Sequence, residues 1–316
     1  MSLKHDATRT RVGLALGSGA ARGWALIGIV RALAEAGFEP DVIAGTSIGA
    51  ITGAAILTDQ LTALEDYARN LKFRDIVGAL DITMSQGGLV STDRIAKDIQ
   101  LHIEDRSIES LRKPFACVAT NLASGREVWC NRGSIKSAIW ASAAMPGLFP
   151  PVERDGRWLI DGALVNPVPV SVCRAMGADI VIAINLNADL SSLPRLEKTG
   201  SAVEEATIPE DAGWLQGSFT SVFGDRGKSW FDTFTSKKTA RPNPIEILVG
   251  STDIFQDRMS RARLAADPPD VLIEPPLGAF GALDFQKADE LIKIGYEHTR
   301  SMVSMIEKDM RRYENH

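Results

Sequence analysis

Two stretches near the amino terminus decide the fold: VGLALGSGAARGWALIGIVRALAEAG at 12–37 and DVIAGTSIGAITGAAIL at 41–57. Each begins with a short apolar run, passes through a glycine-rich turn, and continues into a segment rich in alanine, leucine and isoleucine. The short runs are typical of buried strands, and the longer segments after the turns favour helices. Short apolar strands that alternate with helices indicate a parallel sheet covered on both faces. The sequence therefore predicts an α/β fold.

Further strands and helices extend this pattern along the chain. We expect helices at about 24–36 and 48–57, mostly helical structure over 60–112, and another helix at 134–145. The segment 114–130 is predicted to form a hairpin that turns near a Ser-Gly pair. Other strands are expected where short apolar runs recur, at 158–160, 178–186, 245–250 and 271–275. A mixed Arg/Asp run at 257–267 indicates a solvated helix face, and an amphipathic helix is expected at about 284–311.

The composition is that of an ordinary globular protein and excludes several classes. Of the 316 residues, 45% are hydrophobic and 24% are charged, which excludes a wholly disordered chain. The formal net charge of -5 does not suggest a nucleic-acid partner. No run of about 18 apolar residues predicts a spanning helix, and the first residues lack the apolar core of a signal peptide. Three cysteines without CxxC spacing indicate buried thiols in a reducing compartment, so we predict a cytoplasmic protein.

The composition changes near residue 187, where a stretch rich in serine, glutamate and proline begins. We therefore expect a flexible amino terminus at 1–10 and a single domain at 11–316 with an insertion at about 188–242. Aromatic residues concentrate at 214–234, and three interpretations stay open: core packing, a lid or acyl-chain site, or peripheral contact with a membrane. The remaining tryptophans of the middle region are expected in the core, namely Trp129, Trp140 and Trp158.

The turn GTSIG at 45–49 matches the pattern GxSxG. This pattern needs a sharp bend between a strand and a helix, which lifts the serine hydroxyl above the edge of the sheet. Gly45 and Gly49 lack the side chains that would clash in so tight a bend. Because an apolar strand precedes the motif and a small-residue helix follows it, Ser47 is a candidate nucleophile. The alternative is an ordinary glycine-rich turn with a helix-capping hydroxyl.

The turn GSGAARG at 17–23 also joins a strand to a helix. Backbone N–H groups at a helix amino terminus attract negative charge, so the turn fits either a dinucleotide phosphate or the oxyanion of acyl transfer. The dinucleotide pattern GxGxxG requires glycine at its sixth position, where this chain has Arg22. The oxyanion interpretation is therefore favoured.

A candidate base follows a short strand in the stretch DGALVNPVP at 161–169. A serine hydroxyl needs a group that accepts its proton before it becomes a good nucleophile. Asp161 is the better candidate, although an aspartate with its ordinary pKa of about 3.9 is a weak base and needs a low-dielectric pocket. A plain turn aspartate is the alternative. The chain has only four histidines, at the termini or in expected helices: His5, His102, His298 and His316.

Taken together and in this order, GSGAARG, GTSIG and DGA resemble the patatin-like phospholipases. ASAAMPGLFPPV at 141–152 is similar to a further block of that family, and VLIEPPLGAFGALDFQKADELIKIG at 271–295 is similar to the carboxy-terminal strand and helix of its bacterial branch. The resemblance covers about 11–186 and 250–300. It implies a three-layer α/β/α sandwich with a mostly parallel central sheet, and a serine esterase that cleaves fatty-acyl esters of phospholipids or lysophospholipids in lipid degradation.

The resemblance also implies roles for residues of this chain. Ser47 would be the nucleophile and Asp161 the base of a dyad without histidine, which acts through an acyl-serine and needs no metal or other cofactor. Backbone N–H groups would form the oxyanion hole, namely those of Gly17, Ser18, Gly19, Ala20 and Ile48. The family's usual glycine block is GGGxRG; here serine replaces the second glycine and the arginine comes one position later. Residues expected to support the turns are Arg22, Gly23, Gly45, Gly49 and Gly162.

Three alternatives stay open at this point. An α/β-hydrolase with a Ser-His-Asp triad would use His298, since the chain order Ser47, Asp161, His298 permits it. A non-catalytic lipid-binding or regulatory protein would keep the fold without the reaction. An acyltransferase would share every residue named above and differ only in the group that accepts the acyl chain. The sequence does not predict the oligomeric state.

Overall fold

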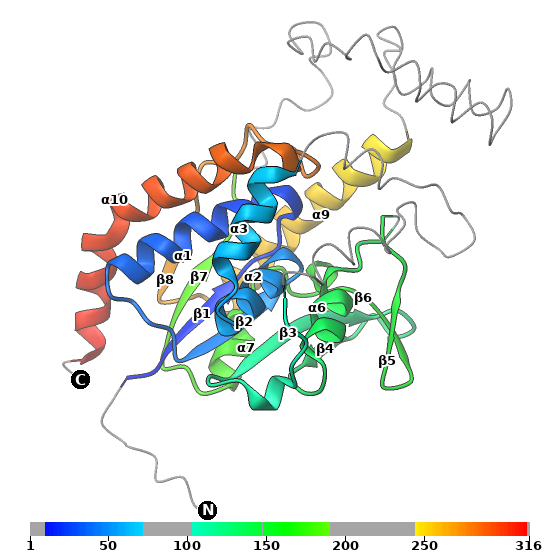
Figure 1. The fold of residues 1–316 in the computed structure, drawn as a ribbon, viewed down its shortest axis with the longest axis horizontal. Coiled ribbons are helices and arrows are strands. Elements are labelled where there is room, and N and C mark those ends of the chain that lie inside the picture. Colours follow the sequence, from blue (N-terminus) through cyan, green and yellow to red (C-terminus); the bar gives the residue numbers. More distant parts are fainter. Residues whose placement is uncertain (1–9, 72–102, 147, 190–243, 315–316) are drawn as a thin grey trace, which may run out of the picture. The chain divides into compact units, whose positions relative to one another are not determined.

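The computed structural model describes residues 10–71, 103–146, 148–189 and 244–314 (Figure 1). The chain divides into two compact units, Met1–Ser191 with Asp253–His316, and Ser192–Thr252. The aromatic segment 214–234 and almost all of the insertion expected at 188–242 lie outside the described residues, as does most of the amino terminus at 1–10. The division into one domain with an insertion stays a prediction. The first unit carries the sheet and all residues predicted to do chemistry.

The first unit is built around one mixed sheet. Its strands are β1 (Val12–Leu16), β2 (Val42–Thr46), β3 (Phe115–Asn121), β4 (Glu127–Cys130), β5 (Val152–Arg154), β6 (Arg157–Asp161), β7 (Ile180–Ile184) and β8 (Val271–Ile273). They follow the order β5-β6-β3-β2-β1-β7-β8, and β4 also pairs with β3. The pairs from β3 through β2, β1 and β7 to β8 are parallel. The pairs of β4, β5 and β6 are antiparallel. The predicted mostly parallel sheet is confirmed.

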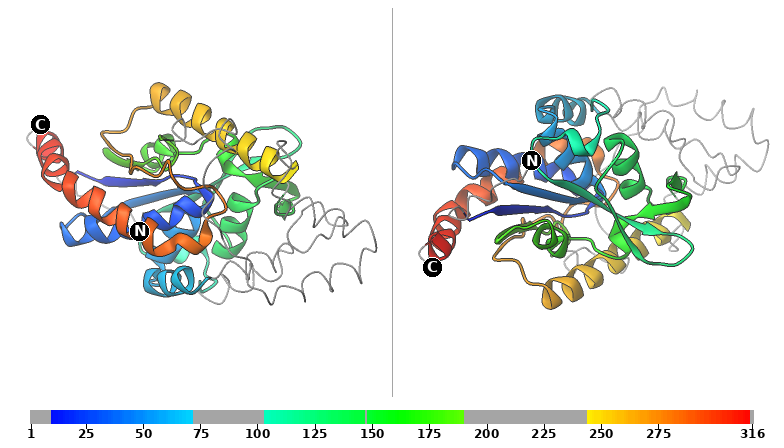
Figure 2. Two further views of the ribbon diagram at one scale, coloured as in Figure 1. Left: turned by 90° about the horizontal axis from the view of Figure 1, so that it is seen from above. Right: turned by 90° about the horizontal axis from the view of Figure 1, so that it is seen from below.

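Helices cover both faces of this sheet. The α-helices are α1 (Ala25–Glu35), α2 (Ile48–Leu57), α3 (Leu61–Asn70), α6 (Ile135–Ala143), α7 (Val170–Ala175), α9 (Pro244–Ala266) and α10 (Ala288–Glu314). Short 3-10 turns are η1 (Ala20–Trp24), η3 (Ile108–Ser110), η4 (Gly162–Leu164) and η8 (Phe285–Lys287). Figure 2 shows α1, α2, α3 and α10 on one face, and α7 with the Asp253–Ala266 part of α9 on the other. The result is the three-layer α/β/α sandwich.

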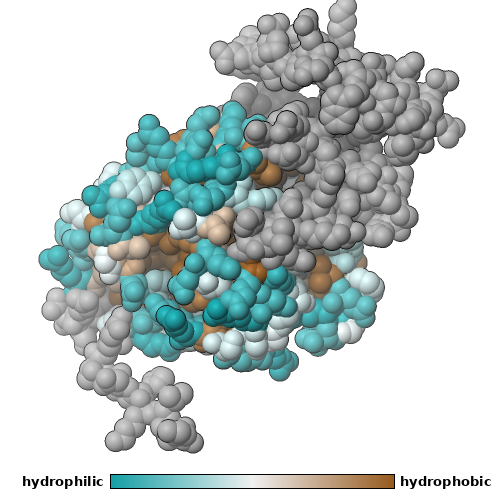
Figure 3. Space-filling model, in the orientation of Figure 1, coloured by the Kyte–Doolittle hydropathy of each residue, from teal (hydrophilic) through white to brown (hydrophobic). Residues whose placement is uncertain are grey.

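Alternating strand side chains fill the two helix–sheet interfaces. Leu14, Leu16 and Ile43 belong to the core under α1 and α2. Ala15 and Val42, one position away on the same strands, belong to the smaller core under α7. This alternation follows from the two-residue period of a strand, and it explains why the strands read as continuous apolar runs. On the described part of the face drawn in Figure 3, hydrophobic residues lie mostly in recesses between hydrophilic ones.

Most predicted elements agree with the structure, including the strand at 12–16, the helix at 48–57 and the hairpin at 114–130. The strand predicted at 245–250 is wrong, because this apolar run is the first part of the long helix α9. A run of six apolar residues fits a strand or a helix equally well, and here the helical pattern continues through the Arg/Asp segment after it. The three cysteines are buried free thiols, as predicted.

Two of the three tryptophans expected in the core are exposed instead. The exposed fraction is 54% for Trp158 and 41% for Trp129. Trp129 lies on β4, which among the described strands pairs only with β3, and Trp158 lies on β6, next to the edge strand β5. Among the described residues, no helix combines the length and the apolar character needed to cross a bilayer.

Candidate active site

The pairing of strand β3 brings two distant segments together. β2 pairs with Phe115–Val118 of β3, and β6 pairs with Ala119–Asn121. β4 occupies the other side of β3 along Cys117–Thr120, so β2 and β6 must share one side. They run in opposite directions and meet end to end, Thr46 opposite Val118 and Asp161 opposite Ala119. Ser47, which follows β2 directly, therefore meets Asp161 at the end of β6.

The turn around Ser47 has the geometry of a nucleophile elbow. Ser47 has φ 57° and ψ -122°, a left-handed conformation that a non-glycine residue rarely adopts. A Cβ atom on Gly49 would lie 2.2 Å from the carbonyl oxygen of Leu16, and one on Gly45 would lie 2.5 Å from that of Gly49. Only glycine fits either position. The Ser47 amide donates a hydrogen bond to the Ser142 Oγ atom at 2.9 Å, which ties the turn to α6.

The hydroxyl and the carboxyl of this pair are in direct contact. Ser47 Oγ donates a hydrogen bond to Asp161 Oδ2 at 2.7 Å, and Asp161 Oδ1 accepts one from the Ala163 amide at 2.8 Å. The exposed fraction is 6% for Ser47 and 2% for Asp161. Burial raises the pKa of Asp161 to about 6, against the two hydrogen bonds, which lower it. A carboxylate with this pKa is ionised at neutral pH and is a better proton acceptor than an exposed one.

The glycine loop at 17–23 offers fewer free amides than the sequence suggests. The Gly17 amide donates to Ile184 O at 3.1 Å, and the Ser18 amide donates to Pro167 O at 2.9 Å. The amides of Gly19, Ala20 and Ile48 have no acceptor among the described residues. Three of the five predicted oxyanion-hole donors therefore have an amide without an acceptor in the described part of the chain. Gly23 packs closely on Ile48, and Gly162 packs on the Val118 carbonyl, so the supporting glycines keep the turns and β3 in contact.

Buried polar side chains hold the same loop from the other side. Arg22 is fully buried, and its guanidinium forms an ion pair with Asp253 at 2.6 Å. It also donates to Asn187 Oδ1 at 3.2 Å and to the carbonyl of Phe280 at 3.3 Å. These contacts join the loop to α9 and to the segments after β7 and β8, and the supporting role of Arg22 stays a prediction.

A second set of contacts holds the loop at Ser18. Its hydroxyl donates to Gln256 Oε1 at 3.1 Å, and Asn187 Nδ2 donates to the Ser18 carbonyl at 3.0 Å. The sequence analysis missed Asn187, Asp253 and Gln256. Because Arg22 stands in an apolar segment, the sequence indicates that it has an acidic partner. The neighbouring residues do not indicate which acid this is.

His298 does not join this site. His298 lies half-buried on α10, its imidazole has no hydrogen-bond partner among the described residues, and burial lowers its pKa. Because the Ser47 hydroxyl contacts Asp161 directly, no imidazole lies between them as a triad requires. Within the described ranges, no three His, Cys, Asp or Glu side chains gather as a metal site would need.

Comparisons with known proteins found a matching family model and several similar proteins. A family model described as patatin-like phospholipase matches residues 14–174. An uncharacterized NTE family protein of Mycobacterium tuberculosis is 31% identical over 320 residues, which cover 90% of this chain and 89% of that protein. Lysophospholipase nte1 of Aspergillus fumigatus is 28% identical over 94% of this chain, which matches 18% of that longer protein. VipD of Legionella pneumophila, a solved structure, is a more distant likeness (TM-score 0.45, 14% identity, 94% of this chain and 67% of that one).

Proposed function

The chain belongs to the patatin-like phospholipase family, and from this premise we propose that it hydrolyses fatty-acyl esters of phospholipids or lysophospholipids through Ser47 and Asp161. The observation that carries the proposal is the buried 2.7 Å hydrogen bond from the Ser47 hydroxyl to the Asp161 carboxylate. A hydroxyl on a strained turn, next to a buried carboxylate and free backbone amides, has what acyl transfer requires.

The reaction proceeds in two halves. Ser47 Oγ attacks the ester carbonyl carbon while its proton passes to Asp161, and the carbonyl oxygen becomes an oxyanion. The ester C–O bond then breaks, the departing alkoxide takes the proton from Asp161, and an acyl-serine remains. Water attacks this acyl group and gives its proton to Asp161. The bond to Ser47 Oγ breaks, the serine recovers the proton, and a fatty acid is released.

The amides of Gly19, Ala20 and Ile48 would stabilise the oxyanion in both halves. Their hydrogens have no competing acceptor in the described structure, unlike those of Gly17 and Ser18. Ile48 is also the first residue of α2, so the positive end of that helix faces the developing charge. Loss of one such donor typically costs about 10²–10³ in rate.

The name of the fungal relatives supports a lysophospholipid as one substrate. The test compares the wild type with Ser47→Ala and Asp161→Asn in hydrolysis of lysophosphatidylcholine and of short and long p-nitrophenyl esters, with EDTA present. We expect the wild type alone to turn over and both variants to lose at least about 10³-fold in rate while they stay folded. Full activity of either folded variant would contradict the dyad.

Two further arms separate the open alternatives. His298→Ala should keep wild-type activity, because its imidazole does not contact Asp161 or Ser47; loss of activity in this folded variant would favour a triad. Product analysis with and without an alcohol or lysolipid acceptor distinguishes hydrolysis from acyl transfer. A wild type inactive on every ester, including lysophosphatidylcholine, would instead favour a lipid-binding role.

A further inference from the structure

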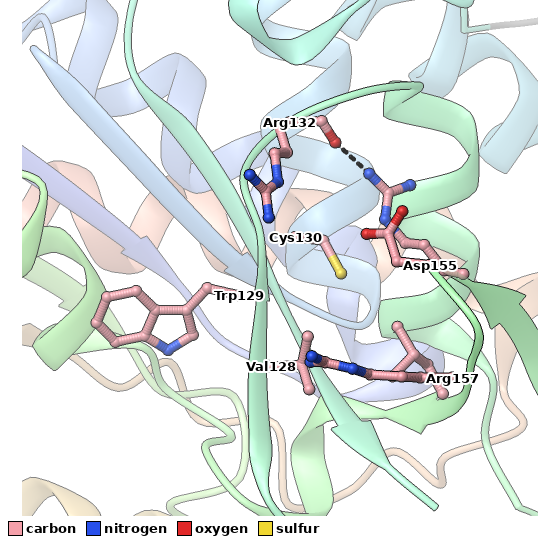
Figure 4. Close-up of a pocket in the computed structure, with 8 residues that line it drawn as sticks. Val128, Trp129, Cys130, Arg132, Asp155 and Arg157 are labelled. Atoms are coloured by element: carbon pink, nitrogen blue, oxygen red, sulfur yellow. Dashed lines mark hydrogen bonds between the residues drawn. The ribbon is translucent and has the colours of Figure 1, made fainter.

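A second hollow lies away from the dyad, between β4 and the β5–β6 hairpin (Figure 4). It encloses about 200 Å³. Its floor is apolar and buried, formed by Cys130 and Leu159, and its rim is charged. The charged lining comprises three guanidinium groups and one carboxylate, namely those of Arg132, Arg154, Arg157 and Asp155. A net positive lining is notable in a chain whose formal net charge is -5.

The arginines of this hollow have two different roles. The Arg154 guanidinium already forms hydrogen bonds within the protein, because it donates to the backbone carbonyls of Arg132 and Ser134. Arg132 and Arg157 form no ion pair with any described residue, and Figure 4 shows both guanidinium groups pointing into the hollow from opposite sides. Two unpaired guanidinium groups around a small cavity present several N–H donors in a fork geometry that suits a phosphate.

The hollow is connected to the dyad through β6. Arg157 begins this strand and Asp161 ends it, a separation of about 13 Å at the usual rise of a strand. Trp158, which points to the face opposite that of Arg157, accepts a backbone hydrogen bond from Leu122, the residue after β3; the two side chains are 54% and 51% exposed. These exposed apolar side chains and the hollow therefore lie on opposite faces of the sheet.

From these observations we infer that the hollow between β4 and the β5–β6 hairpin binds a phosphate group through Arg132 and Arg157. The phosphate has two sources with the same chemistry, a lipid headgroup at a bilayer surface or a free phosphate ion. The inference does not depend on the proposed hydrolysis, because none of these residues contacts Ser47 or Asp161.

The test uses the full chain in a Ser47→Ala background, so that lipid vesicles stay intact. Arg132→Ala/Arg157→Ala removes the two unpaired guanidinium groups. Arg126→Ala/Arg112→Ala is the matched control, since it removes the same charge from exposed positions outside the hollow. Binding of inorganic phosphate is measured by calorimetry, and sedimentation measures binding to phosphatidylcholine vesicles with and without phosphatidic acid.

We expect the cavity variant to lose at least about tenfold in affinity for the probe that binds, since charge-assisted hydrogen bonds are lost, while the control keeps its affinity within about twofold. Loss of inorganic phosphate binding identifies a free ion as the ligand; loss confined to vesicles with phosphatidic acid identifies a headgroup. Equal losses in both variants, or no binding of either probe by the parent protein, would overturn the inference. Arg157→Glu, with thermal unfolding measured alongside, gives a second variant that should lose binding without losing the fold.

Discussion

The two glycine-rich turns of this protein each join a strand to a helix, but different contacts hold them in place. The elbow at 45–49 is held by close backbone packing, with Gly49 on the Leu16 carbonyl, and by neutral hydrogen bonds such as that from the Ser47 amide to Ser142 Oγ. The glycine loop at 17–23 is held by side chains from far along the chain: Arg22 and Asp253 are 231 residues apart, and Ser18 and Gln256 are 238 apart. The first turn depends mostly on close backbone packing, and the second depends on a buried ion pair and side chains of α9.

The comparison shows which parts of the candidate site a short sequence motif can predict. A strand, two glycines and a small-residue helix in the right order mark the elbow in the sequence. The glycine loop needs α9 and the end of β7 to be in place before its amides point correctly. A local motif is thus enough to find the candidate nucleophile, while the proposed oxyanion hole depends on tertiary contacts.

The largest effect on stability should come from removing the distant support of the glycine loop. Asp253→Ala leaves the Arg22 guanidinium buried without a counter-charge, which typically costs about 3–5 kcal/mol of unfolding free energy. We also expect kcat to fall by about tenfold or more, because the loop amides lose their alignment. Urea unfolding and ester hydrolysis measure the two effects.

A matched control lies on the same helix. Arg261 forms an exposed ion pair with Asp257 at 2.8 Å, and Arg261→Ala should cost less than about 1 kcal/mol. The double variant Arg22→Met/Asp253→Leu removes both buried charges and should recover most of the stability while kcat stays low. If Asp253→Ala costs no more than Arg261→Ala, the glycine loop is held locally as well, and the contrast between the turns disappears.

The next largest effect should come from the elbow. Gly49→Ala would place a Cβ atom 2.2 Å from the Leu16 carbonyl oxygen and 2.7 Å from that of Gly17, so both turns must shift. We expect a loss of about 3 kcal/mol in unfolding free energy, at the upper end for overpacking. Gly37→Ala is the control, because Gly37 has φ +82° but an open surrounding, and should cost only about 1 kcal/mol. Similar costs for the two variants would show that close packing does not fix the elbow.

A smaller effect on activity is expected from a change of pH, which should act through Asp161 and not through the glycine loop. Because the pKa of Asp161 is raised to about 6, kcat/KM should rise with pH, pass its midpoint near 6 and then level off. Gln256→Ala, which loosens the glycine loop, should lower kcat a few-fold at every pH without moving this midpoint. A midpoint that moves with Gln256→Ala would mean that the two turns are coupled through the base.

The same pKa shift predicts the pH dependence of stability. The folded protein holds the Asp161 proton more tightly than the unfolded chain, so ionisation destabilises the fold as pH rises from about 4 through about 6. Asp161→Asn lacks this penalty and should gain up to about 3 kcal/mol over the wild type at pH 8, and little at pH 4. Chemical unfolding at both values tests it; a variant less stable at pH 8 than at pH 4, relative to the wild type, would contradict the shift.

The sequence predicted the features that depend on neighbouring residues and missed those that depend on tertiary contacts. The strand at 12–16, the helix at 48–57 and the candidates Ser47 and Asp161 follow from local patterns. Asp253 and Gln256 could not be found this way, since nothing near them in the sequence marks them as partners of residues 17–23. The exposure of Trp158 was missed for the related reason that a strand does not reveal which of its faces a helix covers.

Because β2 and β6 meet end to end along β3, the distance between Ser47 and Asp161 does not depend on the length of the chain between them. Ser47 and Asp161 are 114 residues apart, yet their contact depends on where each strand stops against the seven residues of β3. Residues added to the hairpin turns at 122–126 or 155–156 leave that spacing unchanged. A slip of one residue between β6 and β3 would instead carry the carboxyl group to the opposite face of the sheet. The loops of this fold can therefore change in length while Ser47 and Asp161 stay in contact, provided that this one register is preserved.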